Sequence, residues 1–128
     1  MIKMAFNAIS LDLREVLPTQ ITVEPIPYDL FQDTPIQIQT ILRKLRRFKG
    51  NRIKSLVYAY YLGEILENVS QSRTSYRSMV TSEHYYQAAI RVYNIFEPYG
   101  LEQVYRTQNT TLTMVRRLTS SEYNHLRN

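Results

Sequence analysis

Residues 34–66 read TPIQIQTILRKLRRFKGNRIKSLVYAYYLGEIL, and the spacing of their apolar side chains predicts two consecutive helices. In the first half these side chains recur at intervals of three and four, which places them along one side of a helix: Ile38, Ile41, Leu42, Leu45 and Phe48. Thr34 is a good N-cap, and Pro35 suits the first helical position, where its missing N–H costs nothing. We therefore expect a helix over residues 35–48.

A second helix is expected over residues 52–68, because Gly50 and Asn51 are natural stop residues between two apolar patterns. Gly63 lies inside this second helix, where glycine costs about 1 kcal/mol relative to alanine. A glycine in that position favours the close approach of a neighbouring helix. Two amphipathic helices joined by so short a break predict an αα-hairpin or a helix-turn-helix corner.

The C-terminal half shows several different sequence patterns in succession. Residues 68–80 are rich in Ser, Asn and Arg and predict a surface loop, and a third helix follows from Thr81 or Ser82 to Phe96. Residues 101–118 then alternate around a polar turn and are enriched in Thr, Val and Tyr, which predicts a β-hairpin. Thr119 and Glu122 match a capping box, so a last helix is expected near residue 120. The chain ends at 128, which leaves open whether a longer natural protein continues beyond it.

The N-terminal part has a different composition from the rest. Pro18, Pro25 and Pro27, followed by Pro35, prevent residues 18–35 from forming one helix. We interpret residues 1–33 as an acidic extended arm, with a short helix over Leu11–Leu17 and an extended piece over Gln20–Glu24. Residues 34–128 form the basic helical domain. The predicted class is α+β and mainly helical, with three to four helices, a C-terminal β-hairpin and a winged-helix-like layout.

Positive charge is unevenly distributed along the chain. Residues 1–33 carry 2 basic and 5 acidic side chains, whereas residues 34–128 carry 14 basic and 6 acidic ones. The densest stretch holds seven cations and no acid: Arg43, Lys44, Arg46, Arg47, Lys49, Arg52 and Lys54. Such a density exceeds what a helix C-terminus needs to balance its dipole. It predicts a surface that contacts several phosphates, although a solvated face or a docking surface for an acidic protein has the same composition.

The order of elements suggests how a duplex would be read. In a winged helix-turn-helix the third helix enters the major groove and the hairpin reaches the backbone or minor groove. That layout would place Tyr85, Gln87, Arg91 and Asn94 at base edges, because Arg pairs with guanine and Asn or Gln with adenine. The hairpin would carry Arg106, Arg116 and Arg117. The leading hypothesis is therefore a nucleic-acid-binding regulatory or accessory module, with DNA favoured over RNA.

Two other functions fit the same residues. Eleven tyrosines without a single Trp are typical of half-buried helix faces and subunit interfaces, although Tyr beside Arg also stacks on unpaired bases. The main alternative is thus a protein-interaction or assembly module with no nucleic-acid role, and under either hypothesis we expect a homo-oligomer, most simply a dimer. A small metal-independent ribonuclease is a third, since such sites leave no linear motif.

Composition argues against several other classes of protein and of binding site. There is no Cys, so neither a disulfide framework nor a thiolate metal site is expected, and the location predicted is cytoplasmic. His84 and His125 lack a second ligand at metal-binding spacing, and no glycine-rich loop for phosphates occurs. We expect no enzymatic activity, no cofactor, no metal and no association with membranes.

Overall fold

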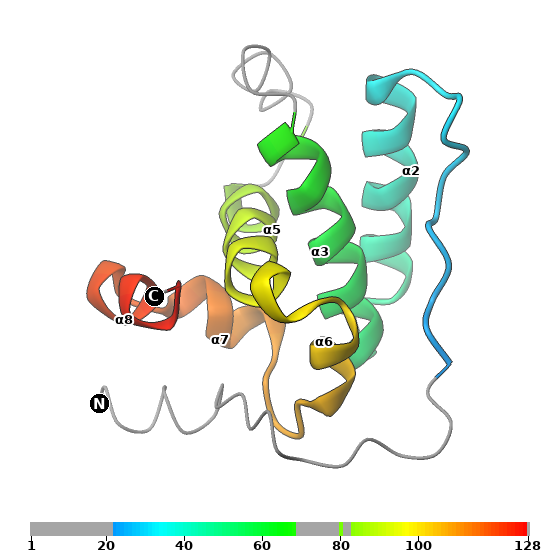
Figure 1. Cartoon of the computed structure of the whole chain (residues 1–128). Coiled ribbons are helices and arrows are strands. Elements are labelled where there is room, and N and C mark those ends of the chain that lie inside the picture. Colours follow the sequence, from blue (N-terminus) through cyan, green and yellow to red (C-terminus); the bar gives the residue numbers. More distant parts are fainter. Residues whose placement is uncertain (1–21, 69–79, 81–82, 128) are drawn as a thin grey trace.

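The computed structural model describes residues 22–68, 80 and 83–127, and within these ranges it contains helices and no strand. Figure 1 shows their arrangement, with two long helices packed on either side of a third. The elements are α2 (Thr34–Arg47), α3 (Arg52–Asn68), α5 (Glu83–Phe96), the 3-10 turn η2 (Glu97–Tyr99), α6 (Glu102–Arg106), α7 (Leu112–Arg117) and α8 (Ser120–Arg127). Among the described helices, none combines the length and apolar composition needed to cross a lipid bilayer.

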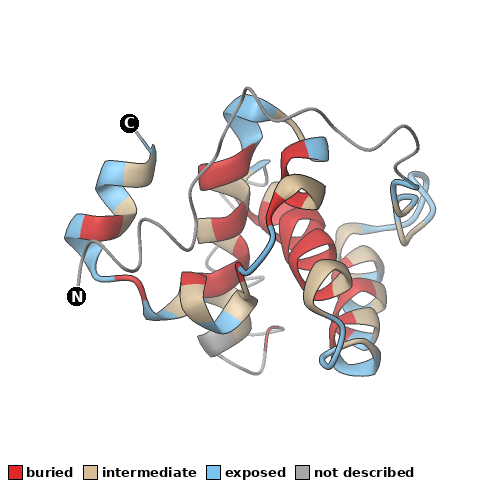
Figure 2. Ribbon diagram, turned by 90° about the horizontal axis from the view of Figure 1, so that it is seen from below, coloured by how far each residue is buried: buried red, intermediate tan, exposed pale blue. Residues whose placement is uncertain are grey.

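Helix α3 is the centre of the core. Nine consecutive residues, Ser55–Gly63, are buried, and Figure 2 shows most of this helix in the colour of buried residues. It lies between α2 and α5, with α6 and α7 against its first turns. A helix that is apolar around its whole circumference has to be enclosed by neighbours. The shorter helices pack on both α3 and α5, because α6 and α7 contact α3 whereas α7 and α8 contact α5.

Gly63 sets how closely α3 and α5 approach. A Cβ added at this position would overlap the backbone carbonyl oxygen of Ala89 and lie 2.7 Å from Cβ of Tyr93. Glycine is therefore the residue that allows the two helix backbones to meet at this crossing. This confirms the close helix packing that a glycine inside the second helix predicts.

The helices expected from apolar spacing are confirmed to within a residue or two. Helix α2 has Asp33 rather than Thr34 at its N-cap, with Pro35 in its first turn. Helix α8 begins as the capping box predicts, because Thr119 N donates to Glu122 Oε1 at 2.9 Å and Glu122 N donates to Thr119 Oγ1 at 3.1 Å. The hydrogen bond from the Thr119 backbone holds the pKa of Glu122 below its usual value.

The β-hairpin predicted over residues 101–118 is wrong, and with it the α+β class and the winged-helix layout. The same apolar residues also stand at helical spacing, with Val104 buried in α6 and with Val115 and Leu118 buried in and after α7. Gly100, at φ 89°, turns the chain into α6. Thr111 then caps α7, since its side-chain oxygen accepts from Met114 N. Local capping and burial therefore outweigh the modest strand preference of Thr and Val.

The described part of the arm, residues 22–33, has no helix or strand and runs alongside α2 toward its first turn (Figure 1). The short helix predicted over Leu11–Leu17 lies outside the described residues. So does most of the predicted loop at 68–80, except for Asn68 at the end of α3 and Val80, which is buried.

Candidate nucleic-acid interface

Solvent-facing cations gather at the C-terminal end of α2 and in the turn that follows it. Arg43, Arg46, Arg47 and Lys49 are exposed, and Lys44 is half-exposed. No described carboxylate forms a salt bridge with any of the four exposed ones. Cations in the last turn of a helix are stabilised by its dipole, so the fold tolerates this density of like charge. We call the exposed set Arg43, Arg46, Arg47 and Lys49 the α2 cationic end.

Two of these side chains share one face of the helix. Arg43 and Arg46, three residues apart, line a shallow depression of about 320 Å³ with Gln39 and Leu42. Arg43 Nη2 donates to Thr40 Oγ1 at 3.3 Å, a weak contact at the surface. Both guanidinium groups therefore remain available to an anion from the solvent.

Arg47 and Lys54 lie on another side, around Phe48. The guanidinium carbon of Arg47 is 5.2 Å from the Phe48 ring centroid, and Lys54 Nζ is 4.3 Å from it. Both distances are typical of cation–π contacts. The predicted run of seven cations is thus divided between two faces of the fold.

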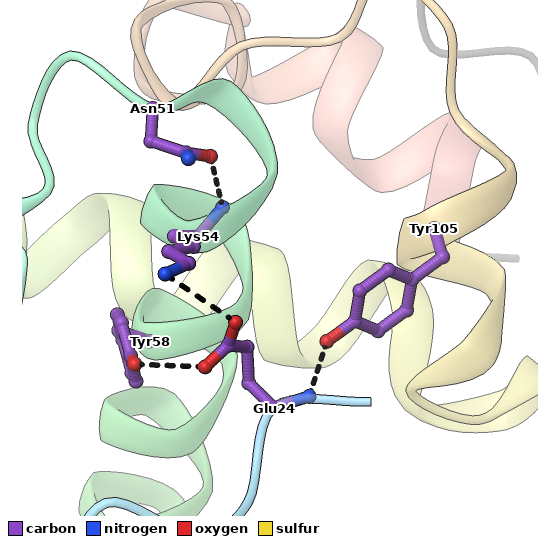
Figure 3. A network of polar contacts seen from close by, with 5 residues as sticks. All are labelled: Glu24, Asn51, Lys54, Tyr58 and Tyr105. Carbon is purple, nitrogen blue, oxygen red and sulfur yellow. Dashed lines mark hydrogen bonds and ion pairs between the residues drawn. The ribbon is translucent and has the colours of Figure 1, made fainter. Parts of the chain in front are cut away.

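The acidic arm meets this second face through Glu24 (Figure 3). Its carboxylate lies 3.6 Å from Lys54 Nζ and accepts from the Tyr58 hydroxyl at 3.2 Å. Its backbone is also held, because Tyr61 donates to the Glu24 carbonyl at 2.7 Å and Glu24 N donates to the Tyr105 hydroxyl oxygen at 2.7 Å. Lys54 is therefore engaged within the chain and does not belong to the α2 cationic end.

Arg52 is likewise occupied inside the fold. It donates to Thr107 Oγ1 at 2.9 Å, to the Thr107 carbonyl at 2.9 Å and to the Thr110 carbonyl at 3.0 Å. Burial lowers the pKa of its guanidinium from the ordinary value. Its three hydrogen bonds hold the α6–α7 loop against the start of α3, so we assign Arg52 a structural role in place of the predicted phosphate contact.

Arg91 closes the C-terminal end of α7 instead of facing bases. It donates to the carbonyls of Leu118 at 2.7 Å, Arg116 at 3.0 Å and Val115 at 3.4 Å. On the same helix, Asn94 Nδ2 donates to the Tyr123 hydroxyl of α8 at 2.8 Å. The face of α5 that the sequence predicts would read a major groove is thus partly covered by α7 and α8.

The three remaining predicted site residues belong to two short helices, α6 and α7. Arg106 is half-buried at the end of α6, whereas Arg116 and Arg117 end α7, half-buried and exposed respectively. Since there is no hairpin to carry them, they do not form a wing.

The tyrosines of α3 belong to the core. Tyr58, Tyr60 and Tyr61 are buried, and the Tyr60 ring meets Tyr93 edge-on at 5.2 Å. Burial raises the pKa of Tyr60 and of Tyr61 to about 12, so both phenols stay protonated at neutral pH. These rings are therefore not available to stack on bases.

A cleft of mixed polar and apolar lining, which the sequence does not reveal, opens beside Lys49. Its volume is about 400 Å³, and it is lined by residues of α2, α3, α5, α7 and the turn after α2: Leu45, Lys49, Gly50, Arg52, Ser55, Tyr85, Thr111, Leu112 and Thr113. These residues are too far apart along the chain to form a motif. Three of them carried a functional prediction, Lys49 and Arg52 as phosphate contacts and Tyr85 as a reader of bases on the third helix.

Within residues 22–68 and 83–127 as described, no three His, Asp or Glu side chains lie close enough together to hold a metal ion. Comparison of the chain with protein-family models, with curated proteins and with solved structures found no match.

Proposed function

We propose that this chain binds nucleic acid, with the α2 cationic end contacting the phosphate backbone. The observation that carries the proposal is four exposed cations on one helix end with no carboxylate partner among the described residues. Guanidinium groups bind phosphate oxygens through two parallel hydrogen bonds, so phosphates fit this surface. Contacts of this kind position a strand without reading its sequence. The proposed role is therefore that of an accessory binding module.

The test compares two variants that lose equal charge. Arg43→Gln with Arg46→Gln removes two cations from the depression on α2, and Arg117→Gln with Arg127→Gln removes two exposed cations elsewhere. At low salt we expect the first pair to weaken binding of a labelled oligonucleotide by about tenfold or more, and the second pair to change it little. The slope of log affinity against log salt should become shallower by about two for the first pair only. Fluorescence anisotropy measures both quantities.

Two results would contradict this proposal. If wild-type protein shows no affinity for any oligonucleotide at low salt, the chain does not bind nucleic acid. If the two variant pairs weaken binding equally, net charge and not the α2 cationic end accounts for the affinity.

A separate observation favours self-association as a second function. Large apolar side chains are exposed where the arm enters α2, with Phe31 97% exposed, Leu30 67% and Ile36 45%. Exposed apolar groups that cluster in this way are typical of interfaces. We propose that a second copy of this chain covers them.

Replacing Phe31 tests this second proposal. Phe31→Ser removes the most exposed apolar ring and should shift the protein from dimer toward monomer in sedimentation-velocity experiments at micromolar concentration. Tyr99→Ser, which removes another exposed ring (43% exposed) in η2, is the control and should leave the oligomeric state unchanged. A wild-type protein that remains monomeric at high concentration would exclude self-association.

A further inference from the structure

The cleft beside Lys49 has walls of different chemistry. Lys49 and Arg52 contribute positively charged residues to the lining, and Thr111 and Thr113 contribute hydroxyl-bearing ones. Tyr85 contributes an aromatic ring from α5, and Leu45 and Leu112 contribute apolar surface. A volume of about 400 Å³ lies in the range of small-molecule sites, which extends from roughly 300 to 1,000 Å³.

Three of the nine lining residues are held by hydrogen bonds before any ligand arrives. Arg52 is held by its three hydrogen bonds to the α6–α7 loop. Ser55 donates its hydroxyl to the Phe48 carbonyl at 2.9 Å, and the Thr111 side chain accepts from Met114 N at 3.2 Å. A site whose lining is already positioned loses little conformational freedom on binding. Lys49, which is exposed, is the lining residue that links the cleft to the α2 cationic end.

We propose that this cleft accepts one unpaired nucleobase from a single strand whose phosphates lie on the α2 cationic end. Tyr85 would stack on the base, the threonine hydroxyls would contact its polar edge, and Lys49 would contact the adjoining phosphate. Aromatic stacking with backbone cations is the usual way in which proteins hold single strands. A base in a duplex has its edge occupied by its partner and cannot enter. The inference rests on the proposed nucleic-acid binding and adds a preference for single strands.

The first experiment uses the unaltered protein and three labelled probes of equal length. These are a single-stranded oligonucleotide, the same backbone with every base removed, and the duplex. Stacking of one base on an aromatic side chain is worth about 1–3 kcal/mol, so the base-bearing strand should bind at least about fivefold more tightly than the baseless one. It should also bind more tightly than the duplex at equal salt.

The outcomes distinguish a failure of the base-binding cleft from a failure of the proposed nucleic-acid binding. Equal affinity for base-bearing and baseless strands would overturn the base-binding cleft and leave phosphate binding intact. Absence of binding to all three probes would overturn both. A free mononucleotide that binds as tightly as the strand would assign the cleft to a small nucleotide and overturn strand recognition there.

A second experiment locates the base. Tyr85→Leu should reduce the preference for the base-bearing over the baseless strand by about tenfold, whereas Tyr85→Phe keeps the ring and should retain it. Tyr99→Leu is the matched control, since Tyr99 is an exposed tyrosine outside the cleft. Thermal unfolding monitored by circular dichroism verifies that each variant is folded. An unchanged preference in a folded Tyr85→Leu variant would place the base elsewhere.

Discussion

Gly63→Ala should lower the free energy of unfolding by about 3 kcal/mol, the upper end of what adding one carbon to a packed interior usually costs. The new Cβ would overlap the Ala89 carbonyl oxygen and lie 2.8 Å from the Ala89 carbonyl carbon. Both are backbone atoms, so no side-chain rotation relieves the clash. Helices α3 and α5 would have to move apart along their shared contact, where most of the core is enclosed.

Gly50→Ala is the control for this substitution. Gly50 has no atom within 4 Å of an added Cβ, and its φ is not positive, so alanine fits there without strain. Urea unfolding followed by circular dichroism compares the two variants. If both variants lose the same stability, the backbones of α3 and α5 do not meet closely at Gly63 and Ala89.

Arg91→Met should also destabilise the fold by about 3 kcal/mol, because three carbonyl groups would lose a charged donor that methionine cannot replace. Hydrogen bonds to charged groups contribute about 1.5–3 kcal/mol each, and bonds that share one guanidinium are not additive. The lost hydrogen bonds would destabilise the C-terminal end of α7 and its junction with α8.

Arg117→Met removes the same charge from an exposed position and provides the comparison. We expect its stability to remain within about 0.5 kcal/mol of wild type, as for most surface substitutions. If both variants unfold at the same urea concentration, Arg91 does not support the fold. If Arg91→Met stays stable but loses affinity for an oligonucleotide, the sequence-based assignment to nucleic acid is the correct one.

How far the fold could be predicted depended on whether a segment had one periodicity or two. The stripe from Ile38 to Leu45 fits only a helix, and it is buried along one side of α2. Between 101 and 118 the residues fit both periods, since alternation coexists with the spacing of Val115 and Leu118. Nothing local to that segment shows that Arg52, 58 residues before Thr110, and Arg91, 27 residues before Leu118, supply donors to its carbonyls.

The cationic run was recognisable in the sequence, but the use of each cation was not. Charge density alone does not distinguish Arg46, which faces solvent, from Arg52, which holds a loop. Whether a cation faces solvent or holds a loop depends on which other segments of the folded chain lie over its side chain. For the same reason the cleft beside Lys49 had no signature, because its lining comes from elements that meet only after folding.

The contacts of Glu24 with α3 and α6 form between parts of the chain that are synthesised at different times. Its backbone amide binds Tyr105, which is added to the chain 81 residues later, whereas Tyr58 and Tyr61 follow it by 34 and 37 residues. At about 5–20 residues per second, Tyr105 is translated roughly 4–16 s after Glu24. The partners of Glu24 on α3 are therefore synthesised well before its partner on α6, so only the α3 contacts are available to the arm until α6 has been made.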